Sequence, residues 1–149
     1  MEIKREKLTR IDECDSERLE IKDCCFCAEV SKASLENSTF NDVNLKGAIF
    51  DKTDMRAAYF NRVGLANSQF KSVNFVRAVF EESGMPAVMF KGVDMERSDF
   101  DGAGLSKSII TNCDLRDVSV RNCRLEGMTI DGISVEEMLE FYKNNHKGE

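Results

Sequence analysis

Residues 71–100 read KSVNF-VRAVF-EESGM-PAVMF-KGVDM-ERSDF, and a large apolar residue closes every block of five. The position two residues before each of these is small, as at Val73, Ala78 and Ser83. The same spacing runs from Leu35 to Val135, where all 21 positions at this interval are large and apolar. A repeat this regular is the first feature to interpret, because it constrains the fold of the whole segment.

A period of five excludes the ordinary elements of secondary structure. On an α-helix, five residues advance about 500°, so the large residues would spiral over every face. On a flat strand, an odd spacing would place alternate members on opposite faces. The pattern therefore predicts a chain that turns a corner every five residues and closes a square coil after four short extended pieces. Small residues are needed at the second inward position because the four sides converge on a narrow axis.

One side of the predicted square shows a motif three residues long. It reads Ala33-Ser34-Leu35, Thr53-Asp54-Met55, Val73-Asn74-Phe75, Val93-Asp94-Met95 and Cys113-Asp114-Leu115. These triplets resemble the Ala-(Asp/Asn)-Leu-X-X consensus of the pentapeptide-repeat family. The resemblance implies an all-β fold, a right-handed quadrilateral β-helix with a short C-terminal capping α-helix. The strict register leaves no room for an inserted loop between residues 33 and 135.

The two ends of the repeat depart from its register. We expect residues 1–18 to form an N-terminal cap or a flexible segment and residues 19–135 to form the solenoid. Its first coil, residues 19–32, should be irregular, because Ile21 lies one residue out of the later frame. Residues 136–149 should hold a helix and a tail. Ser134 and Glu137 have the spacing of an N-terminal capping box, and an apolar stripe follows and ends near Asn145. A solenoid end exposes its core, so we interpret this helix as a lid.

Nothing in the sequence has the pattern of a catalytic site, and we predict a protein that is not an enzyme and binds no cofactor. There is one histidine, His146, near the end of the sequence, and no glycine-rich phosphate loop. A structural zinc site would need the cysteine cluster Cys14, Cys24, Cys25 and Cys27. The alternative, which we favour, is that Cys24 faces the core, as Cys113 and Cys123 should do. We therefore predict no metal.

Composition places limits on location and partners. Hydrophobic residues make up 42% of the 149 residues and charged residues 32%, as in a globular protein. No apolar run reaches the length of a membrane span, and the first residues lack the apolar stretch of a secretory signal. We expect a cytoplasmic protein with reduced cysteines. The net charge of −6 argues against direct binding of nucleic acid.

Three sets of outward residues are candidates for contact with a partner. The first is an uncharged interaction surface on two neighbouring sides of the square. The second is a dimer contact on the C-terminal helix, as in gyrase-binding members of the family. The third is an acidic face, flanked by Arg62 and Arg121. The interaction surface comprises Ile49, Met89, Ile109, Gly64, Gly84 and Gly104. The dimer contact comprises Met138, Leu139, Phe141 and Tyr142, and the acidic face comprises Asp42, Glu81, Glu82, Asp99 and Asp101.

Two functions fit these candidates. The first is a binding or scaffold protein that presents flat solenoid sides to a protein partner or to itself, with a homodimer possible. The second, implied by the family, is mimicry of duplex DNA, which binds DNA gyrase or topoisomerase and protects it from quinolones. Duplex DNA carries one negative charge per about 1.7 Å, so five coils spanning about 24 Å should display about fourteen. Residues 31–135 carry 14 acidic and 13 basic side chains, so the charge favours the first function.

Overall fold

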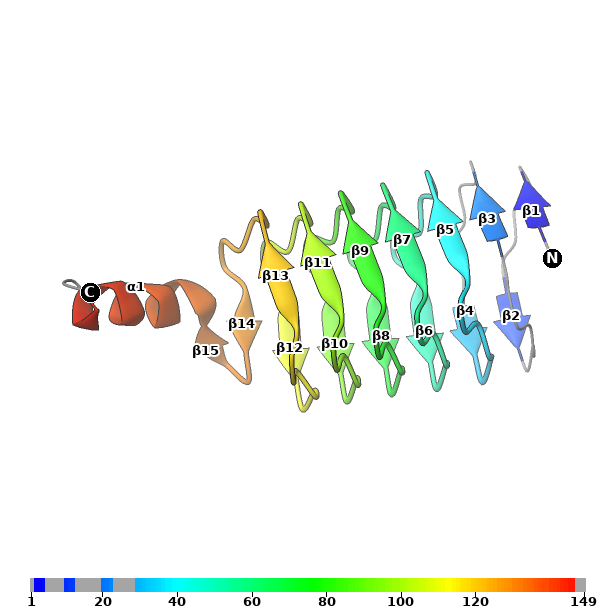
Figure 1. The fold of residues 1–149 in the computed structure, drawn as a ribbon. Coiled ribbons are helices and arrows are strands. Elements are labelled where there is room, and N and C mark those ends of the chain that lie inside the picture. Colours follow the sequence, from blue (N-terminus) through cyan, green and yellow to red (C-terminus); the bar gives the residue numbers. More distant parts are fainter. Residues whose placement is uncertain (1, 5–9, 13–19, 23–28, 147–149) are drawn as a thin grey trace.

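The structure is a computed structural model that describes residues 2–4, 10–12, 20–22 and 29–146. Short strands stack along one axis into two sheets, and a single helix, α1 (Val135–Asn145), follows the last of them (Figure 1). The first sheet, in spatial order, contains β1 (Glu2–Lys4), β3 (Glu20–Lys22), β5 (Thr39–Asn41), β7 (Tyr59–Asn61), β9 (Val79–Glu81), β11 (Asp99–Asp101) and β13 (Ser119–Arg121). The second contains β2 (Arg10–Asp12), β4 (Glu29–Ser31), β6 (Ile49–Asp51), β8 (Gln69–Lys71), β10 (Met89–Lys91), β12 (Ile109–Thr111), β14 (Thr129–Ile130) and β15 (Ile133–Ser134).

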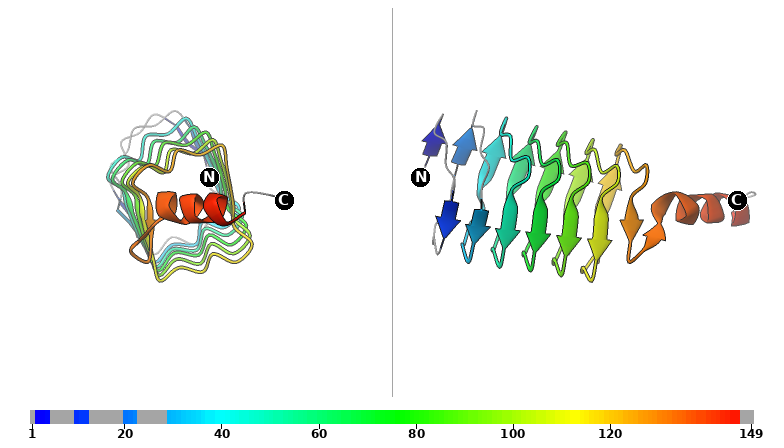
Figure 2. Two further views of the ribbon diagram at one scale, coloured as in Figure 1. Left: turned by 90° about the vertical axis from the view of Figure 1, so that its left-hand side faces the viewer. Right: turned by 180° about the vertical axis from the view of Figure 1, so that it is seen from behind.

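Viewed along the axis, the coil has four sides (Figure 2). Two opposite sides are the seven-stranded and the eight-stranded sheet. The other two are ladders of single bridges. We call them the aspartate side, with Ser34, Asp54, Asn74, Asp94 and Asp114, and the glycine side, with Asn44, Gly64, Gly84, Gly104 and Arg124. Along the chain, each coil passes from the eight-stranded sheet through the aspartate side, the seven-stranded sheet and the glycine side.

The register of the strands repeats the sequence period. Thr39 pairs with Tyr59 and Tyr59 with Val79, so each coil takes four of the five-residue repeats. Toward the N-terminus the coils shorten, because Thr39 pairs with Glu20, and Glu20 pairs with Glu2. Ile21 therefore stands in the Phe40 column, and the expected one-residue slip is confirmed.

Residues 1–18 contain two strands, where the sequence led us to expect a cap or a flexible segment. β1 pairs with β3, and β2 pairs with β4, both in parallel. The two ladders thus begin earlier in the chain than the expected solenoid boundary at residue 19. Residues 5–9 and 13–19 lie outside the described part of the chain.

The core consists of stacked apolar columns, as the period predicts. Phe40, Phe60, Phe80 and Phe100 stack with ring centroids 4.6–4.7 Å apart and nearly parallel planes. On the opposite side, Phe50, Phe70 and Phe90 stack in the same way. Phe75 fills the axis between the two columns and touches Phe60, Phe70 and Phe80 edge-on. The inward small residues are buried with them, so the interior is continuous along the stack.

Left-handed backbone produces the corners. Every fifth residue from Lys32 to Gly127 has a positive φ, between 48° and 73°. Most of these residues are not glycine, and the left-handed conformation places steric strain on these non-glycine residues. From Lys32 to Lys107, the corner N–H groups donate to carbonyl groups of the next coil, as from Ala57 N to Val76 O at 2.9 Å. The inter-coil hydrogen bonds therefore hold a conformation that the local sequence does not favour.

The C-terminal end differs from the expected solenoid, which was to continue to Val135. Asp131 and Gly132 both have positive φ, 46° and 80°, and form a two-residue turn. The chain folds back, so β15 pairs antiparallel with β14, and the Ile133 side chain is 55% exposed. The last regular coil thus ends at Ile130, and Val135 opens the helix.

The expected helix is confirmed, but its expected role as a lid is wrong. The Ser134 hydroxyl accepts a hydrogen bond from the Glu137 N–H at 3.3 Å, as the capping box predicts. None of the helical residues is buried. The helix extends away from the last coil at an angle to the solenoid axis, so that it runs sideways across the coil outline in the view along the axis (Figures 1 and 2). The antiparallel turn at Asp131–Gly132 sets this exit.

We predict that Phe80→Ala raises the free energy of folding by about 3–5 kcal/mol, because it leaves a cavity in the stacked column. Glu81→Ala, on the adjacent outward position, should cost less than about 1 kcal/mol, because it removes one surface hydrogen bond. Chemical denaturation of both variants measures the difference. Equal losses of stability would contradict the assigned register.

The corner strain gives a second prediction. Ala66→Gly should destabilise the protein by about 0.5–1 kcal/mol, because Ala66 does not have a positive φ. Ala87→Gly should be neutral or stabilising, because Ala87 has a φ of 56°, which glycine adopts without strain. Denaturant melts of this matched pair should differ by about 1 kcal/mol. A larger loss for Ala87→Gly than for Ala66→Gly would show that the corners are not strained.

Candidate interaction surfaces

The eight-stranded sheet carries the predicted apolar strip. Met89 pairs directly with Ile109, and these two side chains are 37% and 42% exposed. Ile49 lies in the same row but is separated from Met89 by Gln69, and it is less exposed. The structure therefore brings Met89 and Ile109 into one patch, with Ile49 two strands away.

The three candidate glycines form a row on the neighbouring side. Gly64 bridges to Gly84, and Gly84 bridges to Gly104. Pro86 and Ala87, both exposed, lie at the corner that joins this row to Met89. The candidate residues that the sequence placed on two neighbouring sides thus meet at this corner. We call this surface, made of Gly64, Gly84, Gly104, Pro86, Ala87, Met89 and Ile109, the uncharged face after these seven residues. The exposed Lys107 lies within it, between Gly104 and Ile109, at the corner that Ala87 occupies one coil earlier.

Neither backbone conformation nor packing within the chain requires these glycines. None of the three has a positive φ. A Cβ atom at Gly84 would meet no atom within 4 Å, and one at Gly104 would lie 3.9 Å from Gly84 Cα. At Gly64 the nearest atom is Asn44 Oδ1, at an ordinary contact distance of 3.5 Å. Glycine within a strand costs about 0.5–1 kcal/mol relative to alanine, so the row keeps backbone accessible at some cost in stability.

Arginine side chains neutralise much of the candidate acidic face. Arg62 forms two hydrogen bonds with the Asp42 carboxylate, at 2.7 and 2.6 Å, and holds the pKa of Asp42 below its usual value. Arg121 lies 2.6 Å from Asp99 and 3.6 Å from Asp101. Three of the five predicted acids therefore have a cationic partner on the neighbouring coil.

The other two acids of the candidate acidic face, Glu81 and Glu82, are adjacent in the sequence and are both exposed. The Tyr59 hydroxyl donates a short hydrogen bond to Glu81, which raises the pKa of Tyr59. Burial and the negative charge of Glu81 act in the same direction. Glu82 occupies the corner, with a φ of 49°. The acidic character of this face thus centres on Glu81 and Glu82.

Sequence reasoning missed a second set of ion pairs, beside the aspartate side. Arg56 contacts Asp54 on its own coil at 2.8 Å and Glu36 on the preceding coil at 3.2 Å. Arg116 repeats this arrangement with Asp114 and Glu96. In the sequence, each arginine follows its inter-coil partner by four repeats, which is one full coil. Opposite charges at this spacing were the signal that would have identified these pairs.

The same region holds three acidic groups close enough to share a cation. Ligand atoms of Asp94, Glu96 and Asp114 lie within 4.8 Å of one another. The Arg116 guanidinium contacts two of these carboxylates and so supplies the positive charge already. The cluster is therefore explained as an ion-pair network between coils.

The cysteines divide into two groups. Cys14, Cys24, Cys25 and Cys27 lie outside the described residues. Cys113 and Cys123 occupy the small inward position, where both pack against the core, as predicted. Burial raises the pKa of both thiols, and the Cys113 thiol also donates to the Thr111 carbonyl at 3.2 Å. These two thiols are structural in position and poorly ionised.

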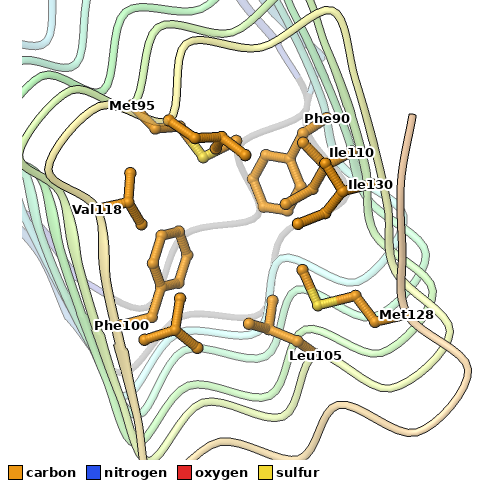
Figure 3. A pocket seen from close by; sticks show the side chains of 10 residues that line it. Phe90, Met95, Phe100, Leu105, Ile110, Val118, Met128 and Ile130 are labelled. Atoms are coloured by element: carbon orange, nitrogen blue, oxygen red, sulfur yellow. The ribbon is translucent and has the colours of Figure 1, made fainter. Parts of the chain in front are cut away.

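The candidate dimer residues form the most exposed apolar group among the described residues. Met138, Leu139, Phe141 and Tyr142 all lie on α1, and Phe141 is 71% exposed. Tyr142 stacks on the His146 ring at the end of the helix. The helix leaves the end of the solenoid open. An apolar cavity of about 220 Å³ is found there, lined by residues of the last coils (Figure 3).

No described helix is both long enough and apolar enough to cross a bilayer. The sequence profile of pentapeptide repeats matches residues 28–63, 38–77 and 90–127, with eight copies of the repeat. These ranges cover more than half of the chain, which therefore belongs to the pentapeptide-repeat family. A comparison with curated proteins finds no match.

Two solved structures illustrate the likeness. HetL, a pentapeptide-repeat protein involved in heterocyst differentiation regulation in the cyanobacterium Nostoc, is 14% identical, with a TM-score of 0.53. The alignment covers 88% of this chain and 81% of HetL. QnrB1, a plasmid-mediated fluoroquinolone resistance protein, is 16% identical, with a TM-score of 0.49, over 83% of this chain and 68% of QnrB1. The predicted fold class, an all-β right-handed quadrilateral β-helix, is confirmed.

Proposed function

We propose that this protein is a non-enzymatic interaction protein whose uncharged face binds an apolar surface of another protein. The observation that carries this proposal is the row Gly64, Gly84 and Gly104. These residues cost stability, and neither their φ angles nor their neighbours explain them. Glycine in a strand is typical of places where another backbone approaches closely.

The side chains beside the row suit the same partner. Met89 and Ile109 stand out from the adjoining sheet and would bury apolar area against an incoming surface. Methionine adapts its shape to a partner, and Pro86 adds a rigid apolar contact at little cost in entropy. A partner of this kind contacts main chain on the glycine side and side chains on the eight-stranded sheet. The face contains one exposed positive charge, on Lys107, and a single charge does not provide the basic surface that nucleic acid requires.

Site-specific photo-crosslinking in the source cell tests the face. A crosslinking amino acid at position 84 should capture a protein that the same probe at position 77, on the opposite corner, does not capture. The captured protein is then purified, and its affinity is measured for the chain and for Met89→Lys with Ile109→Lys. We expect the double variant to weaken binding at least tenfold, because two charges would be buried in an apolar contact.

Two results would contradict this proposal. One is the same set of crosslinked proteins from positions 84 and 77. The other is unchanged affinity of the double variant, with its fold intact by circular dichroism. A third probe at position 82 addresses the acidic face: capture there alone, of a DNA-binding enzyme, would favour the alternative function.

DNA mimicry, the alternative function, has weaker support from the charges. Asp42, Asp99 and Asp101 are paired with arginines, so the acidic face has fewer free charges than its sequence suggests. Glu81 and Glu82 remain, on one corner of one coil. A mimic of duplex DNA needs a continuous row of charge along the axis. The uncharged face is therefore the better-supported interface.

The C-terminal helix supports self-association as a second property. An isolated helix of 11 residues is marginally stable in water, and α1 gains no buried residue from its own chain. Its apolar stripe of Met138, Leu139 and Tyr142 is exposed and would be stabilised by packing against a partner outside the chain. Two copies related by a two-fold axis would bury the same stripe on both helices.

We predict a dimer that Met138→Asp with Leu139→Asp converts to monomer, because the substitutions place charges in the helix contact. Sedimentation velocity of both proteins over a range of concentrations measures the change. The thermal stability of the solenoid should be unaffected, since neither side chain is buried in the monomer. Met89→Lys with Ile109→Lys serves as the control and should leave the dimer intact. A wild-type chain that stays monomeric at high concentration would exclude this mode of self-association.

A further inference from the structure

The eight-stranded sheet carries two lysines that lie directly opposite each other. Lys71 on β8 pairs with Lys91 on β10 in parallel register, so the two side chains leave the same face of the sheet about 4.8 Å apart. Asp51, on β6, lies on the other side of Lys71. Within the part of the chain that the structure describes, neither lysine forms an ion pair. Like charges on facing positions of neighbouring strands repel, so the lysine pair does not stabilise the fold.

The arginines on the other sides of the solenoid are placed differently. Arg62 and Arg121 each contact an acid on the preceding coil, beside the seven-stranded sheet. Arg56 and Arg116 do the same beside the aspartate side. The spacing of one coil thus brings opposite charges together on these two sides, whereas on the eight-stranded sheet it brings two like charges together. The lysine pair is a positive charge that the described chain does not neutralise.

The lysine pair lies next to the uncharged face. Met89 and Lys91 are both on β10, two residues apart, so their side chains leave the same face of the sheet about 7 Å from each other. Two further exposed lysines, Lys52 and Lys107, occupy corners that border the sheet. From β6 to β12, the sheet and these two rows of corners contain four lysines and one acid, Asp51, a net charge of +3. The chain as a whole has a net charge of −6, so its positive charge is concentrated here.

We propose that Lys71 and Lys91 bind carboxylate groups of the partner, which is therefore an acidic protein segment. This inference rests on the proposed function of the uncharged face and specifies the chemistry of the protein that binds there. Complementary charge beside an apolar contact accelerates association and discriminates between partners. Nucleic acid is disfavoured, because its phosphate backbone offers no apolar side chain to Met89 and Ile109 and is repelled by the net charge of the chain.

Two polypeptides of defined composition are the probes for this chemistry. They are a random copolymer of glutamate and tyrosine, and polyglutamate of the same length. Fluorescence titration of the full-length protein measures both affinities. Lys71→Gln with Lys91→Gln should weaken binding of the copolymer at least about threefold at about 50 mM salt, because two ion pairs are lost. The difference from wild type should disappear at about 1 M salt, where the charges are screened.

A matched control removes two charges elsewhere. Arg77→Gln with Lys143→Gln changes two exposed cations that lie away from the eight-stranded sheet, and it should leave the affinity unchanged. The thermal stability of Lys71→Gln with Lys91→Gln should equal or exceed that of the wild type, because the repulsion between the two lysines is relieved. A structural role of the lysines would instead lower the melting temperature.

Three results would overturn the proposal. One is an unchanged affinity of the Lys71→Gln with Lys91→Gln variant, and another is an equal loss in the matched control. The third is lysine-dependent binding of duplex DNA as tight as that of the copolymer, which would make the ligand a polyphosphate.

A further variant separates this proposal from the proposed function. Met89→Gln with Ile109→Gln removes the apolar contact and keeps both lysines. If it weakens binding of the copolymer and the lysine variant does not, the uncharged face stands and the acidic partner is excluded. If only the lysine variant weakens binding, and polyglutamate binds as tightly as the copolymer, the acidic contact stands and the proposed apolar contact is contradicted.

Discussion

The structure depends on a left-handed residue at every corner. A chain of L-residues does not adopt that conformation readily, yet it recurs every five residues from Lys32 to Gly127. From Lys32 to Lys107 the corners are held because the N–H of each donates to a carbonyl of the next coil, and because, through most of the stack, the large residue two positions earlier is buried. Local strain and long-range packing are thus inseparable. A single coil would have too few stabilising contacts to hold its own corners, whereas in a stack every interface stabilises the two coils on either side of it.

Most of this architecture could be predicted from the sequence, because the apolar pattern and the five-residue period assign the same positions to the interior in every column. Phe80 had to point inward once Phe60 and Phe100 did, and the small residues had to accompany them. The N-terminal slip at Ile21 was visible for the same reason. By contrast, a local turn sequence determines where the solenoid ends. Asp131–Gly132 favours a two-residue hairpin turn, and it overrides the apolar residues at Ile133 and Val135, which continue the period. The direction of the helix follows from that turn and not from its apolar stripe.

The candidate surfaces were less accessible to sequence reasoning, because they depend on distances between coils. Gly84 and Met89 were assigned to neighbouring sides, and the structure adds that Pro86 and Ala87 are exposed at the corner between them. The acidic residues were identified correctly as outward, but their charge depends on arginines one coil away. Arg62 reaches Asp42 because two positions four repeats apart in the sequence lie one strand spacing apart in space.

The constant register also bears on how the length of this molecule is determined. Between β5 and β12, the strands pair at a fixed interval of four repeats, and every side chain keeps its side from one coil to the next. A duplication or deletion of one such unit leaves inward residues inward and outward residues outward. The cross-section stays the same, while the axis lengthens or shortens by one strand spacing, about 4.8 Å. Evolution can therefore adjust the reach of the protein in fixed increments, without redesigning either its interior or its ends.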